Sequence, residues 1–215
     1  IGTFPSAGQY WVPQVARELS KEFPDLVLHI DLLDLIHGPG NGYDLDLRAE
    51  DPNEPPTVVQ GYRRFALVDE PYVLVLPADH PLAAQDRVSL AEVARERQIS
   101  EGSQDASCAR ILNRSWGALG VSPRYAARSS DHHAAIALVQ SGVGVTLLPR
   151  LAMGTLPPGL VQREIADDAP PIRRIVVFVR EESGPRTAVA RALQLLREIA
   201  RRSTPTEARV DVETI

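Results

Sequence analysis

The sequence predicts an α/β fold with a mostly parallel sheet, because segments with strand and helix periodicity alternate along its 215 residues. The clearest unit is Ala134–Arg150, where a helical pattern, a Gly-x-Gly turn and an apolar run follow one another. Gly142 occupies the position after a helix C-terminus that favours left-handed backbone. A dinucleotide fingerprint needs its glycines before a helix. We therefore interpret Gly142 and Gly144 as structural residues and not as a phosphate loop.

Strands are expected where short apolar or alternating runs are bounded by proline, glycine or polar clusters. These runs are Ile1–Phe4, Leu26–Leu33, Asp44–Arg48, Tyr72–Leu76, Gln98–Ser100, Arg124–Arg128, Val143–Leu148 and Ile172–Val179. In the third run Leu45 and Leu47 alternate with Asp44, Asp46 and Arg48, which predicts a strand with one dry and one wet face.

Helices are expected where apolar residues recur every three or four positions. They are Val12–Phe23, Leu90–Arg95 with Ser89 as N-cap, Cys108–Leu119, the helix that Ser129-Ser130-Asp131 caps and that ends at Gly142, and Pro185–Arg202. Pro5–Gly8 and Glu101–Ala106 are expected to be turns, and Leu35–Tyr43 a loop. Ser203–Ile215 lacks a sustained pattern and is expected to be a mobile tail.

Charge and composition exclude several classes of function. A net charge of −5 argues against this chain gripping nucleic acid unaided. Cys108 is the only cysteine, so no disulfide or CxxC site is predicted, and a buried thiol is favoured over a nucleophile. No apolar run approaches the length of a membrane span. The chain starts at Ile1 without a methionine, so we expect a fragment of a longer protein.

The sequence carries no motif that demands catalysis. A GxSxG elbow, an HExxH helix and a P-loop are all absent. The carboxylate pairs Asp44/Asp46 and Asp167/Asp168 are interpreted as a wet strand face and a loop. His132 and His133 are adjacent, whereas two metal ligands on one helix need a spacing of three or four. We expect no enzyme activity, no cofactor and no metal site.

Three phrases of the sequence carry a family resemblance. They are Gly2-Thr3-Phe4-Pro5-Ser6-Ala7-Gly8, the run from Val73 to Leu82, and the run from Leu138 to Val145 followed by Leu147-Leu148-Pro149. Each is weak alone, but together and in this order the chain resembles the effector-binding domain of LysR-type transcriptional regulators. The resemblance covers nearly everything from Ile1 to Arg202.

The resemblance implies a two-lobed fold like that of type 2 periplasmic binding proteins, crossed twice by the chain. Residues 1–69 with 165–202 would form lobe I and residues 70–164 lobe II, with the crossings near Asp69–Pro71 and Glu164–Ile165. It also implies a winged helix-turn-helix that is absent from this fragment, a homodimer or tetramer, contact with DNA only through that missing domain, and a cytoplasmic protein without membrane contact.

The expected site lies at three turns that precede helices, because ligands in open α/β sheets bind beyond the carboxyl ends of strands. The effector-binding candidates there are Ser6, Ala7, Gly102, Ser103, Gln104, Ser130, Asp131 and His132. Free backbone N–H groups at such turns suit a small anion. Ser6 and Ser103 match positions at which the family contacts effectors, with helix capping as the alternative. His132 either reads the ligand or simply faces solvent.

One departure from the family concerns the segment between the second and third strands. The family normally has a leucine-rich helix there, whereas Leu35–Tyr43 contains Gly-Pro-Gly-Asn-Gly. The missing helix would leave one face of strand Asp44–Arg48 uncovered, which would explain its charged residues. It also puts in doubt the family's effector contact near Asp34 and Leu35.

The leading hypothesis is a domain that binds a small, anionic metabolite between two lobes and thereby controls DNA binding or transcription by the full-length protein. The alternative is an extracytoplasmic solute-binding receptor of the same fold, which a signal peptide upstream would reveal. An enzyme is the third hypothesis, since fold alone does not exclude catalysis.

Overall fold

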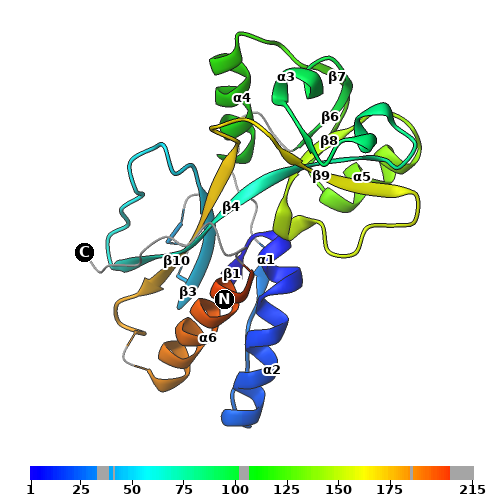
Figure 1. Cartoon of the computed structure of the whole chain (residues 1–215). Helices are drawn as coiled ribbons and strands as arrows, with labels where there is room; N and C mark the ends of the chain where they lie inside the picture. The colour runs from blue at the N-terminus through cyan, green and yellow to red at the C-terminus, as the bar shows by residue number, and fades with distance from the viewer. Residues whose placement is uncertain (33–38, 41, 102–106, 185, 204–215) are drawn as a thin grey trace. The chain divides into compact units, whose positions relative to one another are not determined.

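The structure is a computed structural model that describes residues 1–32, 39–40, 42–101, 107–184 and 186–203. Its chain forms two compact units, the first made of Ile1–Glu70 with the chain from Arg174 onward and the second of Pro71–Arg173. Two long strands, β4 (Tyr62–Pro77) and β10 (Ile172–Arg180), contain the two points at which the chain passes between units (Figure 1).

The second passage differs from its expected place near Glu164–Ile165. Those two residues belong to β9 (Leu160–Ile165), which pairs with β4 and with β5 (Arg87–Val88) inside the second unit. The chain therefore leaves that unit only at Arg173. Sequence spacing did not reveal β9, because its run contains Gln162, Arg163 and Glu164 and has no continuous apolar pattern.

The sheet of the first unit has the order β2-β1-β3-β10-β4. β1 (Gly2–Thr3) pairs in parallel with β2 (Asp31–Leu32) and β3 (Leu45–Glu50), whereas β10 is antiparallel to β3. The sheet is therefore mixed, and the expectation of a mostly parallel sheet was wrong. Only two residues of the expected strand Leu26–Leu33 pair within the described residues, and Leu26, Val27, Ile30 and Leu32 are exposed.

The described residues of the first unit contain three helices: α1 (Pro5–Tyr10), α2 (Val12–Glu22) and α6 (Thr187–Ser203). α2 and α6 run side by side, and Arg191 of α6 forms an ion pair of 2.8 Å with Glu22 of α2 (Figure 1). Leu45 lines a small cavity with residues of α6, so one face of β3 packs towards this helix. The expected helical periodicity of both long helices is confirmed.

The opposite face of β3 is not wet. Asp46 is 0% exposed and Arg48 only 5%, although strand alternation points both away from Leu45 and Leu47. Arg48 Nε donates to Asp46 Oδ1 at 2.7 Å, and the Gly40 N–H donates to the same carboxylate at 3.3 Å. The charged residues thus form a buried ion pair, which corrects the prediction of a solvent-facing strand. Most of the segment Leu35–Tyr43 lies outside the described residues.

The second unit is built on the second half of β4. This strand pairs antiparallel with β8 (Thr146–Pro149) and with β9. A two-stranded parallel sheet, β6 (Arg97–Glu101) and β7 (Arg124–Ser129), is attached through a parallel bridge between Gln98 and Val145. The helices are α3 (Leu90–Val93), α4 (Ser107–Leu119) and α5 (His132–Gln140), with 3₁₀ turns at Pro81–Ala84 and Arg150–Ala152.

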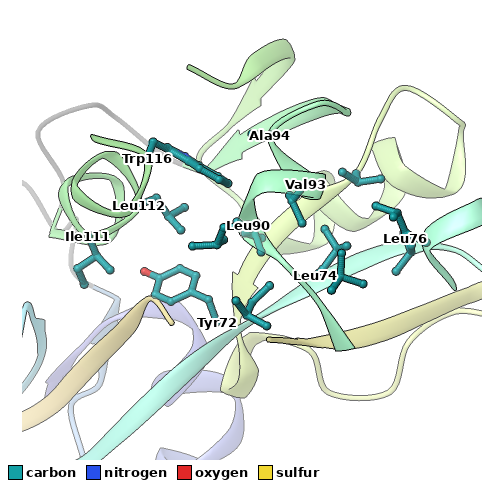
Figure 2. Packing of buried hydrophobic residues seen from close by; sticks show 14 of the residues in the cluster. Tyr72, Leu74, Leu76, Leu90, Val93, Ala94, Ile111, Leu112 and Trp116 are labelled. Atoms are coloured by element: carbon teal, nitrogen blue, oxygen red, sulfur yellow. The ribbon is translucent and has the colours of Figure 1, made fainter. Parts of the chain in front are cut away.

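Both faces of β4 are covered in this unit. Tyr72, Leu74 and Leu76 pack with α3 and α4 in one core, as Figure 2 shows, whereas Val73 and Val75 belong to a second core that includes α5. A strand buried on both sides needs a continuous apolar run, which explains why Tyr72–Leu76 was recognisable from sequence. Cys108 lies in the first core and is 2% exposed, so the predicted buried thiol is confirmed.

The start of α3 shows how local sequence defines an element. Ser89 accepts a hydrogen bond from the Glu92 N–H, and the Glu92 carboxylate accepts one from the Ser89 N–H at 3.0 Å. This capping box confirms the predicted N-cap. The hydrogen bonds that Ser89 and then Gln85 donate to the Glu92 carboxylate lower its pKa to about 2, because they stabilise the charged form.

Candidate functional site

The first expected turn, Pro5–Gly8, is the beginning of helix α1. Proline at its first position supplies a helical φ and lacks an N–H that the first turn would leave unpaired. Ser6 follows as an interior residue of the helix and is 1% exposed, and Ala7 is buried as well. Phe4 and not Ser6 is the N-cap residue, so the helix-capping alternative for Ser6 was wrong. Ser6 thus lies where β1 ends and the first helix begins.

The second and third expected turns leave the same edge of a sheet. β6 and β7 pair in parallel up to Glu101 and Ser129, which are direct partners in the ladder. Neighbouring strands lie about 4.8 Å apart, so the chain enters 102–106 and 129–132 from adjacent points. Gly102, Ser103 and Gln104 themselves lie outside the described residues. The register places Glu101 and Ser129, the strand residues at which the two turns begin, side by side at the carboxyl ends of two parallel strands.

The third turn is organised by Ser129 and Asp131. Ser129 Oγ donates to the Asp131 carbonyl at 2.9 Å and accepts from the Asp131 N–H at 3.2 Å. Asp131 is the N-cap of α5, and its Oδ1 accepts from the Ala134 N–H at 2.7 Å. The predicted cap is confirmed. The Asp131 carboxylate therefore already accepts one of the N–H groups of the first turn of α5. It also places a negative charge beside the expected anion site.

The remaining residues of this turn differ in exposure. Ser130 is exposed, and His132 is half-buried as the first residue of α5. The Nδ1 of His133 lies 4.0 Å from Asp131 Oδ2, on an exposed part of the helix. Among the described residues, no group of three or more histidine, cysteine or carboxylate side chains is arranged to hold a metal ion.

The two glycines singled out in the sequence have structural roles. Gly142 has a φ of +75°, and its N–H bonds to the Val139 carbonyl at the end of α5. A Cβ at Gly144 would overlap the carbonyl oxygen of Arg97, because β6 approaches the backbone there. Both observations support the structural interpretation over the phosphate loop.

The buried Asp46–Arg48 ion pair is the feature of the first unit that sequence reasoning missed. The signal was present, since opposite charges two positions apart on a strand share one face and can pair. Gly2 of β1 pairs with Asp46 of the parallel strand β3. Because the two strands run in the same direction, Arg48 lies beyond Asp46, towards the end at which β1 leads into α1.

In the part of the chain that the structure describes, no helix is long and apolar enough to cross a membrane.

Comparisons with known proteins agree on one family. The model of the LysR substrate binding domain matches residues 1–201. A probable hydrogen peroxide-inducible genes activator of Streptomyces viridosporus is 30% identical over 204 residues, covering 90% of this chain and 61% of the relative. The chain spans about half the length of the first such activators it matches.

Solved structures show the same fold. The BenM effector-binding domain with its effector benzoate has a TM-score of 0.76 at 16% identity, covering 97% of this chain and 96% of that chain. The effector-binding domain of QuiR in complex with shikimate has a TM-score of 0.71 at 15% identity, covering 95% and 97%. The predicted α/β, periplasmic-binding-protein-like fold is confirmed, with its sheet mixed. With the family model matching nearly its entire length, this chain belongs to the LysR substrate-binding domain family.

Proposed function

We propose that this chain is the ligand-sensing part of a LysR-type transcriptional regulator and that it binds a small carboxylate. The observation that carries the proposal is the parallel register of β6 and β7, which places Glu101 and Ser129 side by side at one sheet edge. Two helices, α4 and α5, begin directly after these segments. Helix beginnings present N–H groups to an anion.

The similar structures support the chemical class of the ligand. Both benzoate and shikimate are small carboxylates, and they are bound to domains of this fold. We infer that Ser6 and Ala7 of one unit and Gly102, Ser103, Gln104, Ser130, Asp131 and His132 of the other contact the ligand. The comparisons favour this regulator over an extracytoplasmic receptor of the same fold, because the matched curated relatives are gene activators.

Several of those relatives are named for induction by hydrogen peroxide, and we do not propose peroxide sensing for this chain on the basis of those names. An internal thiol–disulfide switch needs two cysteines, and this sequence contains only Cys108. Its thiol is buried in the core of the second unit, where peroxide and reductants have little access. We therefore propose ligand occupancy, and not disulfide formation in this chain, as the signal that the full-length cytoplasmic protein passes to its DNA-binding part.

The first prediction concerns two serine hydroxyls. Ser6→Ala and Ser103→Ala should each weaken binding of benzoate or shikimate by about 0.5–1.5 kcal/mol, or about 2- to 12-fold, because each removes a neutral hydrogen bond. Isothermal titration calorimetry on the wild type and both variants measures the change. Ser20→Ala, on the exposed side of α2, is the matched control and should leave affinity unchanged. Equal affinities in all four proteins would remove both serines from the site.

The second prediction concerns assembly. We propose a homodimer or tetramer that uses the exposed apolar stretch beside edge strand β2, where Leu32 is 67% exposed. Leu32→Glu should shift the protein towards monomer in size-exclusion chromatography with light scattering, since a charge would be buried in the interface. Val58→Glu, at a position 92% exposed in another segment, should not. A wild-type protein that stays monomeric at high concentration would contradict the assembly.

A further inference from the structure

A groove along α6 in the first unit has no part in the proposed function. It encloses about 750 Å³ between α6, the end of β10 with the turn that follows, and the first residues of β4. Its lining residues on the helix run from Val189 to Arg201, so it follows about 18 Å of helix at 1.5 Å per residue. A volume of this size is typical of sites for small molecules.

One part of the groove holds arginines without acidic partners. The guanidinium groups of Arg197 and Arg63 lie 4.8 and 5.3 Å from the centre of the Phe65 ring. Neither of them, nor Arg201, forms an ion pair with a carboxylate in the described ranges. The Nε of Arg197 is buried and finds no hydrogen-bond acceptor among the described residues. Two cations on one ring repel each other, and a buried donor without an acceptor is unfavourable.

The acidic residues of the groove do not remove this excess charge. Glu198 accepts a hydrogen bond from Gln194 at 2.9 Å and lies 3.8 Å from Arg191, so it is engaged on its own helix. The lining contains four arginines and two glutamates, in a protein whose overall net charge is −5. The local excess of positive charge therefore opposes the overall charge of the chain.

Another part of the groove is apolar. Val189 and Leu193 lie on the same side of α6, four positions apart, where the apolar pattern of the sequence predicts an inner face. Both are only half-buried, and they line the groove together with Val179. Apolar surface that stays wet is unfavourable until something covers it. The groove thus combines apolar side chains with guanidinium groups around Phe65 that have no carboxylate partner among the described residues.

We propose that this groove is a second ligand site, which binds an organic carboxylate with a hydrocarbon or aromatic body. The carboxylate pairs with the guanidinium groups of Arg197 and Arg63 and relieves the repulsion between them, as guanidinium–carboxylate pairs are charge-assisted. The body covers Val189 and Leu193. This site lies entirely within the first unit and is independent of the turns at Ser6, Ser103 and Asp131.

Decanoate tests the proposal, because it has a carboxylate head and an extended apolar body. Calorimetric titration of the whole chain should show saturable binding, and Arg197→Gln and Arg63→Gln should each weaken it about 10-fold, the effect of losing a hydrogen bond to a charged group. Arg124→Gln, at an exposed position of β7 in the second unit, removes the same charge away from the groove and should match the wild type. Arg201→Gln, at an exposed helix position, should also weaken binding and is not expected to affect folding.

Several results would overturn the proposal. The first is the absence of saturable decanoate binding, and the second is an equal affinity of Arg197→Gln and Arg124→Gln for decanoate. The third is a loss of decanoate binding in Ser6→Ala while Arg197→Gln binds decanoate as the wild type does. A change from dimer to monomer in Arg197→Gln with unaltered decanoate affinity would show that a second copy of the chain occupies the groove. The sensing function is read separately with shikimate and Ser6→Ala, since shikimate lacks an extended apolar body. Failure of one proposal is thereby distinguished from failure of the other.

Discussion

Replacing Arg48 with methionine is expected to lower the free energy of unfolding by about 3–5 kcal/mol, because it leaves the buried Asp46 carboxylate without its ion-pair partner. Asp46 is 0% exposed, and its described partners are the Arg48 guanidinium and the Gly40 N–H. A single N–H at 3.3 Å does not compensate a buried negative charge. Urea unfolding followed by circular dichroism measures the change.

The double variant Asp46→Leu with Arg48→Met is the matched control. It replaces both charges by apolar side chains, and replacing both members of a buried pair in this way is often neutral. We expect it to recover most of the stability lost in Arg48→Met. If Arg48→Met cost less than 1 kcal/mol, Asp46 would be reached by water or carry a proton, and the buried pair would not exist as described. If the double variant were no more stable than the single one, loss of packing and not the unpaired charge would explain the effect.

Replacing Gly144 with alanine should destabilise the second unit by about 3 kcal/mol, at the upper end for an overpacked site. The new Cβ would overlap the carbonyl oxygen of Arg97 and lie 3.0 Å from its carbonyl carbon. Backbone cannot move aside as a flexible side chain can. The strand β6 would have to shift. That shift would strain two hydrogen bonds of 2.8 Å, which the Val145 N–H donates to the Arg97 carbonyl and the Ile99 N–H donates to the Val145 carbonyl. Thermal unfolding monitored by calorimetry measures the loss.

Gly117→Ala provides the opposite expectation in the same unit. Gly117 lies inside α4, and a Cβ there meets nothing within 4 Å. Alanine is favoured over glycine in a helix by about 0.5–1 kcal/mol, so this variant should be slightly more stable than the wild type. A Gly144→Ala protein as stable as the wild type would contradict the close approach of β6. It would also reopen the interpretation of Gly142 and Gly144 as a loop for a bound group.

Much of the fold was predictable because several elements carry local signals. Ser89 and Asp131 cap helices through their own side chains, and Gly142 ends α5 in the left-handed region. The run Tyr72–Leu76 is apolar throughout because two cores cover it. Each of these features depends on a few neighbouring residues, so sequence alone was sufficient to place them.

Other elements depend on distant partners and were not predictable in the same way. The charged run of β9 becomes a strand because β4 and β5 pair with it. The direction of β10 against β3 made the sheet mixed, and no local pattern encodes strand direction. Asp46 and Arg48 looked solvent-facing because alternation shows which residues share a face and not whether that face is covered.

For the expected site, the sequence predicted the positions of turns but not the contacts that their residues make with a ligand. The sequence indicated that three segments precede helices, and the ladder between β6 and β7 shows that two of them leave one sheet edge. The helix-capping alternative for Ser6 was wrong, because Phe4 is the N-cap residue of α1 and Pro5 is its first helical residue. The contacts of Ser103 and His132 with a ligand stay predictions, since the sequence specifies a family of sites and not the ligand that fills this one.

The most direct test of the sensing proposal is hydrogen–deuterium exchange of the chain with and without a saturating small carboxylate, chosen by calorimetry from a panel that includes benzoate and shikimate. We expect slower exchange in 5–10, 101–107 and 129–134 together, because the bound anion accepts hydrogen bonds from N–H groups at all three helix beginnings. If no member of the panel bound, or if protection excluded these three segments, the chain would not sense small carboxylates in the way proposed.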